Sequence, residues 1–206
     1  APQEGPGGPV PAAQIATLTN DYQFTGLSIT KQVDTEATEG EFGPFTFTLS
    51  CTSATGVPVA FDDEGTTELS FTLEAGETWT APADRIPVGA ECALAETDEF
   101  FADQIVITGS NVVDNGDGTA TITPGVDPAE IEVTNGYDAG TLTVGKVVTG
   151  EGADLYGTGS FQFSATCTYH GQTLLDEEFA LRGGDTRTFG VFPAGTDCVV
   201  TEETTG

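Results

Sequence analysis

The chain has 206 residues and a formal net charge of −28, from 33 acidic and 5 basic residues. This charge argues against nucleic acid and anionic membranes as partners, since both attract clusters of Lys and Arg. No apolar run approaches the ~18 residues of a membrane-spanning helix. The acidity itself favours a soluble, self-repelling surface, with cation uptake or life in a salty medium as the alternative.

Residues 1–24 are expected to form a Gly/Pro-rich leader followed by a single strand. Four prolines before residue 12 favour an extended or disordered leader. The strand is expected from Ile15 to Tyr22, and one of its faces carries Ala16, Leu18, Asn20 and Tyr22. It resembles the last strand of a domain without the rest of that domain.

Residues 25–139 are expected to form a complete β-sandwich. Short segments alternate apolar and polar residues, with turn signals such as Asn115-Gly116 between them. Positions that share the inward face are Leu27, Ile29, Lys31 and Val33; Phe45, Phe47, Leu49 and Cys51; Cys92, Leu94 and Glu96; and Ile131, Val133, Asn135 and Tyr137. This pattern predicts an all-β, antiparallel sandwich.

Residues 140–206 repeat the beginning of this pattern. The two lysines of the chain, Lys31 and Lys146, each lie eleven residues after an asparagine. Other matches follow in order: Phe45-Thr46-Phe47 with Phe161-Gln162-Phe163, Cys51 with Cys167, Ile86-Pro87 with Phe192-Pro193, Cys92 with Cys198, and Glu96 with Glu202. The sequence therefore predicts a second sandwich. Since it stops soon after Glu202, this sandwich is expected to lack its last strands.

Three polar residues fall on inward-facing positions: Lys31, Glu96 and Asn135. The second repeat supplies the same types at Lys146 and Glu202, and the N-terminal strand supplies Asn20. Burying such groups is costly unless they are paired. The alternative is that each lies at a strand end and reaches out to water.

Together these residues predict a cross-linking reaction. Burial lowers the pKa of a lysine, and a neutral amine is a nucleophile. The asparagine side-chain carbonyl is an electrophile, and a protonated glutamate can polarise it and transfer protons. The product would be a Lys–Asn isopeptide bond, formed once with loss of ammonia. We therefore expect no enzymatic turnover, no cofactor and no metal site.

Three features of the sequence resemble the CnaB-type domains of Gram-positive surface proteins and pili. They are the lysine of the first strand, the glutamate in an Ala-Glu-Thr or Thr-Glu-Glu context, and the terminal Val-Thr-Asn-x-Tyr strand. The cysteine-containing repeats are similar to those of actinobacterial surface proteins. The resemblance implies Ig-like sandwiches in a stalk or pilus-like fibre on the cell surface. It also implies a Lys31–Asn135 cross-link assisted by Glu96. The chain contains neither a Leu-Pro-x-Thr-Gly sorting signal nor a pilin lysine motif.

The cysteines are expected to pair within each repeat, Cys51 with Cys92 and Cys167 with Cys198, because each pair occupies equivalent strands. Disulfides imply an oxidising, extracellular setting. Buried free thiols are the alternative.

The expected partner is a second copy of the chain. Its strand Ile15–Tyr22 would complete the second repeat and bring Asn20 to Lys146 and Glu202, which gives a head-to-tail fibre. The alternative is a piece cut from a longer array of repeats. A different class of function is an adhesin or glycan-binding module that uses sandwich loops, with Trp79 and Tyr169 as candidate aromatics. His170 is the only histidine and is not part of a Ser/His/Asp set, so hydrolase chemistry is not expected. Asp114–Gly118 is typical of a hairpin turn, and its spacing does not fit a calcium loop.

Overall fold

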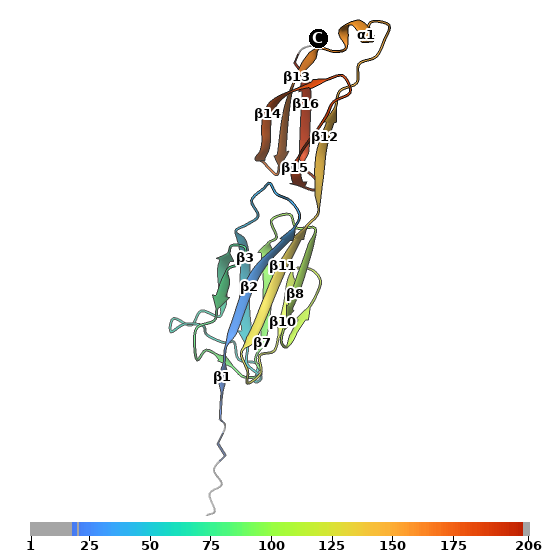
Figure 1. Cartoon of the computed structure of the whole chain (residues 1–206). Helices are drawn as coiled ribbons and strands as arrows, with labels where there is room; N and C mark the ends of the chain where they lie inside the picture. Colours follow the sequence, from blue (N-terminus) through green and yellow to red (C-terminus); the bar gives the residue numbers. More distant parts are fainter. Residues whose placement is uncertain (1–17, 20, 204–206) are drawn as a thin grey trace, which may run out of the picture.

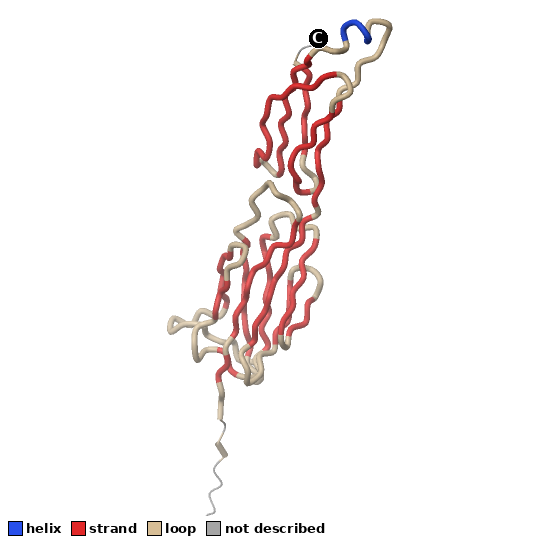
Figure 2. Tube along the Cα trace, in the orientation of Figure 1, coloured by secondary structure: helices blue, strands red, loops and turns tan. Residues whose placement is uncertain are grey.

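The computed structural model describes residues 18–19 and 21–203, and they form two β-sandwich units (Figure 1). Of the expected strand Ile15–Tyr22, residues 15–17 and Asn20 lie outside these residues, and residues 18–19 and 21–22 do not form a strand. Figure 2 shows that strands dominate both units. The described part of the chain contains no helix that is long and apolar enough to cross a membrane.

The first unit consists of strands β1 to β11. They are β1 (Phe24–Thr25), β2 (Leu27–Thr35), β3 (Phe45–Thr52), β4 (Glu68–Leu73), β5 (Thr78–Thr80), β6 (Ile86–Pro87), β7 (Glu91–Asp98), β8 (Gln104–Gly109), β9 (Val112–Asp114), β10 (Thr119–Ile122) and β11 (Ala129–Tyr137). The two main sheets have the strand orders β4-β3-β7-β10-β9 and β5-β2-β11-β8. The apolar inward positions expected from the alternation form one buried cluster between them, with Val33 packed against it.

One strand pair departs from the antiparallel arrangement of the others in the described residues. β2 and β11 are parallel neighbours, with Val133 opposite Lys31 and Asn135 opposite Val33. Such a pair needs a long crossover connection, because its strands enter from the same end. The first long strand and the last strand of the unit therefore lie side by side.

The second unit repeats part of the strand arrangement of the first unit. Its elements are β12 (Ala139–Gly145), α1 (Ala153–Tyr156), β13 (Ser160–Tyr169), β14 (Gln172–Arg182), β15 (Thr186–Pro193) and β16 (Asp197–Glu202). β12 pairs with β15, and β14-β13-β16 form the facing sheet. β12 corresponds to β2, but among the described residues no strand pairs with its other edge.

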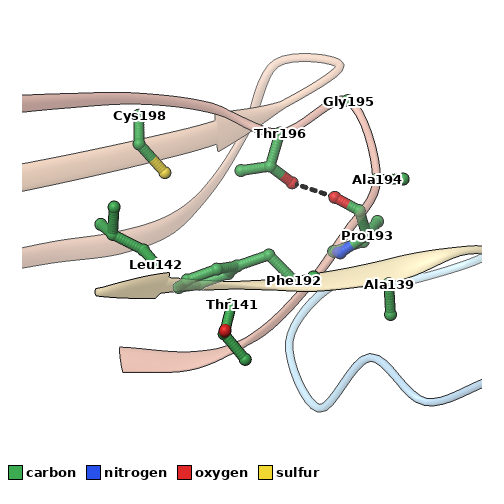
Figure 3. A pocket seen from close by; sticks show the side chains of 10 residues that line it. Ala139, Thr141, Leu142, Phe192, Pro193, Ala194, Gly195, Thr196 and Cys198 are labelled. Carbon is green, nitrogen blue, oxygen red and sulfur yellow. Dashed lines mark hydrogen bonds between the residues drawn. The ribbon is translucent and has the colours of Figure 1, made fainter. Parts of the chain in front are cut away.

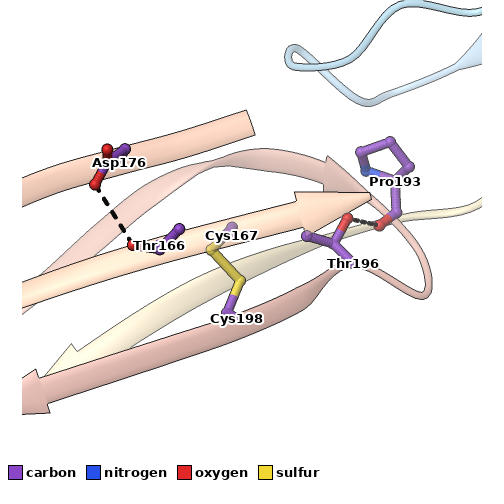
Figure 4. The surroundings of a disulfide bond; sticks show 6 residues. All are labelled: Thr166, Cys167, Asp176, Pro193, Thr196 and Cys198. Atoms are coloured by element: carbon purple, nitrogen blue, oxygen red, sulfur yellow. Dashed lines mark hydrogen bonds between the residues drawn. A yellow bond between two sulfur atoms is a disulfide. The ribbon is translucent and has the colours of Figure 1, made fainter. Parts of the chain in front are cut away.

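Each unit contains the expected disulfide, Cys51–Cys92 in the first and Cys167–Cys198 in the second. Each bond joins strands that are direct neighbours, since Cys51 pairs with Cys92 and Cys167 with Cys198 in the sheet registers. Figure 4 shows the second disulfide beside Thr166 and Thr196. In the chain-entropy model a disulfide that closes such a loop contributes roughly 4 kcal/mol.

The two disulfides should differ in their resistance to reductant. Cys51, Cys92 and Cys167 are buried, whereas Cys198 is partly exposed. Because thiol–disulfide exchange requires access to a sulfur atom, we expect dithiothreitol to reduce Cys167–Cys198 first in the native chain. Alkylation at successive times, followed by peptide mass spectrometry, measures the order. Equal rates for both bonds would contradict this expectation.

The loop that follows β2 contacts the second unit. Thr38 donates its backbone N–H to the carbonyl of Val191 at 2.8 Å, and Gln172 exchanges two hydrogen bonds of 3.0 Å with the backbone of Glu41. The Phe101 and His170 rings stack with centroids 3.5 Å apart. Figure 1 shows that the units meet end to end, and these hydrogen bonds and the ring stacking connect them at the junction.

Candidate functional site: a buried Lys–Glu–Asn cluster

The fold brings Lys31, Glu96 and Asn135 together inside the first unit. Lys31 on β2 and Asn135 on β11 come from one sheet, and Glu96 on β7 comes from the facing sheet. Each lies at an inward position of its strand. The exposed fractions are 0% for Lys31, 5% for Glu96 and 0% for Asn135, so none of the three reaches bulk water.

Glu96 lies between the other two residues. Its Oε1 accepts a hydrogen bond of 2.8 Å from Asn135 Nδ2 and lies 3.5 Å from Lys31 Nζ. Lys31 Nζ also donates a weak hydrogen bond of 3.4 Å to the Val133 carbonyl and lies 4.2 Å from the centroid of the Phe45 ring. The amine thus has one carboxyl partner in otherwise apolar surroundings.

A loop of the first unit holds the asparagine from the other side. The backbone carbonyl of Glu99 accepts hydrogen bonds of 3.1 Å from Asn135 Nδ2 and from the hydroxyl of Tyr137. Phe42 covers Tyr137 with ring centroids 4.3 Å apart. The side-chain amide of Asn135 is therefore fixed by two acceptors, one of them a backbone atom that sequence analysis did not identify.

Burial shifts the titration of the pair. Desolvation lowers the pKa of Lys31 to about 8, although the nearby Glu96 carboxyl opposes the shift. Desolvation likewise raises the pKa of Glu96, against the opposing effects of Lys31 and of the Asn135 hydrogen bond. Both shifts favour the neutral forms, a free amine and a carboxylic acid.

Two buried acceptor atoms of the cluster lack a hydrogen-bond donor among the described residues, Glu96 Oε2 and Asn135 Oδ1. An unpaired buried acceptor costs about 1–3 kcal/mol. Because an unpaired buried charge costs more than an unpaired neutral group, a proton on Glu96 would lower the cost of leaving Oε2 without a partner. The unpaired atoms therefore point, like the pKa shift, to a protonated carboxyl group.

The second unit holds the corresponding lysine and glutamate in a more open setting. Lys146, one residue past β12, donates hydrogen bonds of 2.9 and 2.8 Å to the two carboxylate oxygens of Glu202. Its Nζ lies 4.2 Å from the centroid of Phe161, as Lys31 lies over Phe45. However, the side chains of Lys146 and Glu202 are 15% and 28% exposed. The expected burial of Glu202 is thus only partial, because no described strand covers this side.

The other candidate residues do not form a second site. Tyr169 is buried in the second unit, and Trp79 stacks on Phe71 in the first. Asp114 accepts hydrogen bonds from the backbone of Gly116 and Ile107 and so shapes the β9–β10 turn. Within residues 18–19 and 21–203 no group of His, Cys, Asp or Glu is arranged to hold a metal ion.

The fold and the cluster define a chain of tandem β-sandwiches with a buried lysine, glutamate and asparagine. A family model described as a domain of unknown function, DUF5979, matches residues 27–138 and again residues 142–206. The chain belongs to this family. No curated protein matches the sequence.

Several solved structures are similar to the chain. The major pilin from Streptococcus pyogenes is 19% identical with a TM-score of 0.46, over 87% of this chain and 82% of the pilin. A bacterial adhesin from Mobiluncus mulieris that contains intramolecular disulfide, isopeptide and ester bond cross-links is 20% identical with a TM-score of 0.39. That match covers 55% of this chain and 41% of the adhesin.

Proposed function

We propose that the chain is a structural stalk or pilus-like fibre subunit of a bacterial cell surface, and that an autocatalytic isopeptide bond between Lys31 and Asn135 locks its first unit. The observation that carries the proposal is the buried contact of Lys31 and Asn135 with the same Glu96 oxygen. Burying a lysine incurs a desolvation penalty, which packing alone would not offset.

The reaction follows from the arrangement of the cluster. The neutral Lys31 Nζ attacks Cγ of Asn135, and the Glu96 carboxyl, whose Oε1 lies near both Lys31 Nζ and Asn135 Nδ2, acts as the acid and base of the reaction. The Cγ–Nδ2 bond then breaks, and Glu96 relays the proton from Nζ to the departing nitrogen, which leaves as ammonia. Because the fold fixes both reactants, proximity supplies much of the acceleration. The first unit reacts once.

The position of the bond suits a load-bearing role. β2 begins near the N-terminal end of the first unit, and the parallel β11 ends at the junction with the second unit (Figure 1). Tension along the chain pulls β2 and β11 in opposite directions and shears the hydrogen bonds between them. A Lys31–Asn135 bond joins these two strands directly, so it would carry that load covalently. The disulfides favour an extracellular location.

Assembly forms the second part of the proposal. We propose that copies of the chain join head to tail through a strand that one copy donates to the next, in the manner of β-strand addition.

Intact-mass measurement tests the cross-link. We expect the chain to be lighter by one ammonia than its sequence requires, beyond the hydrogens lost to the two disulfides. Peptide mapping should recover a branched peptide that joins Lys31 to Asn135. The Lys31→Arg variant, which keeps a cation at this position, should have the full mass. An unmodified mass for the parent chain would refute the bond.

A further inference from the structure

One short loop of the first unit contacts both the buried cluster and the second unit. It is the connection between β7 and β8, residues 99–103. At its start the backbone carbonyl of Glu99 accepts a hydrogen bond of 3.1 Å from Asn135 Nδ2. In its middle the Phe101 ring stacks on His170 of the second unit, with centroids 3.5 Å apart and an interplanar angle of 1°. The loop therefore connects the cluster with the junction between the units.

The backbone of this loop is strained. Phe100 and Phe101 have φ angles of 49° and 61°, in the left-handed region that residues other than glycine rarely adopt. Such a conformation persists where the surrounding structure fixes it. From the inside, the Phe100 ring packs edge-on against Phe45 with centroids 6.3 Å apart. From the outside, the contact is His170, which lies closer to Phe101 than the Phe100 ring does at 6.1 Å. The second unit thus contributes one of the two contacts that hold the loop.

The end of the loop is tied to the linker between the units. A single residue, Asp138, separates β11 from β12. Its backbone N–H donates a hydrogen bond of 2.8 Å to Asp103 Oδ2, and its carbonyl accepts one of 2.7 Å from the backbone of Ala194. The next residue, Ala139, pairs with Pro193 in the sheet of the second unit (Figure 3). The second unit therefore holds the loop at its end as well as at its middle.

The start of the loop bears directly on the reaction. Asn135 Nδ2 is the nitrogen that leaves as ammonia, and its two acceptors are Glu96 Oε1 at 2.8 Å and the Glu99 carbonyl at 3.1 Å. Together they fix the plane of the side-chain amide, and with it the direction from which Lys31 Nζ meets Cγ. A backbone carbonyl does not ionise, so its contribution depends only on where the loop holds it. A shift of the loop would leave Nδ2 with one acceptor and free the amide to rotate.

We propose that the second unit accelerates bond formation in the first unit: its His170 stacks on Phe101 and so holds the Glu99 carbonyl against the leaving nitrogen. Phe101 and His170 act through that carbonyl and are therefore positioning residues. This inference rests on the proposed function, because it concerns the rate of the same reaction. It gives the reaction an order along the chain, since a unit becomes cross-linked fastest once its neighbour has folded against it.

Refolding kinetics of the full chain test this inference. Unreacted chain is refolded from denaturant at neutral pH, and intact mass gives the fraction that has lost ammonia, while Trp79 fluorescence follows the folding of the first unit. Phe101→Ala and His170→Asn should each slow the loss of ammonia without changing the Trp79 signal. The stack can bias the loop by no more than its own interaction free energy, which for an aromatic pair corresponds to about twofold to tenfold in rate.

The choice of variants separates the stack from folding. His170 has a φ of 44°, a conformation that asparagine adopts readily, so His170→Asn removes the ring and keeps the turn. The double variant should react no more slowly than either single variant, because both changes remove the same contact. Phe101→Tyr keeps a stacking ring and should react at the parent rate. So should the control Phe24→Ala, which removes a ring that is 51% exposed, against 58% for Phe101, at the opposite end of the first unit (Figure 1).

Three results would overturn the inference. The first is loss of ammonia at the parent rate in either Phe101→Ala or His170→Asn. The second is a double variant whose slowing is the product of the two single effects, which would show that the residues act separately. The third is equal slowing in Phe24→Ala. Absence of the bond from the parent chain is a different result, because it refutes the proposed function itself.

Discussion

In the variant Asn135→Ala, the first unit should melt about 20 °C or more below the melting temperature that it has in the parent chain. The Lys31–Asn135 bond would close a loop of about 100 residues, for which the chain-entropy model gives about 4.7 kcal/mol. In a domain of this size each kcal/mol shifts the melting temperature by about 4–8 °C. The fluorescence of Trp79 measures this transition selectively, because the only tryptophan of the chain lies in the first unit.

Two further variants separate the bond from packing. Glu96→Gln keeps the shape of the cluster, together with Lys31 and Asn135, but removes the acid that the reaction needs, so it should also melt early. Lys146→Arg changes the equivalent lysine of the second unit and should leave the Trp79 transition unchanged. If Glu96→Gln lacks the bond yet melts with the parent chain, the bond does not stabilise the unit.

Strand alternation predicted the inward position of all three cluster residues, because the period of two is local to each strand. It did not predict which residues lie opposite one another. Val133 faces Lys31 only because β11 reaches β2 through a crossover of the whole unit. Glu99 holds Asn135 through a backbone carbonyl, and a backbone acceptor leaves no signature in the residue type.

Alternation also overstated the burial of the second unit. Val200 has the inward parity of Leu94, yet it is 37% exposed, because an inward position is buried only where a facing layer exists. The contacts between the units were missed for a related reason. His170 stacks on Phe101 across the junction, and neither residue belongs to a repeated pattern. Contacts of this kind depend on how two folded units meet.

The pH dependence of bond formation should have a plateau that ends near pH 8. The reactive state has a neutral Lys31 and a protonated Glu96, which is the same number of protons as the ion pair. Between the pKa values of the coupled pair, the rate should therefore vary little with pH. Above the Lys31 pKa of about 8, the pair loses its shared proton and Glu96 can no longer act as an acid, so the rate should fall about tenfold per pH unit.

A chain produced and kept in denaturant, then refolded at a series of pH values, allows this measurement. Samples are quenched in acid denaturant, and intact mass gives the fraction that has lost ammonia, while Trp79 fluorescence follows folding separately. The rate of bond formation in Glu96→Gln should be lower by at least about a hundredfold, and it should not fall above pH 8. A simple nucleophile would behave in the opposite way, because deprotonating a lysine that acts alone raises its reactivity. A rate that climbs from pH 7 to 10 would therefore show that Lys31 attacks without a proton from Glu96.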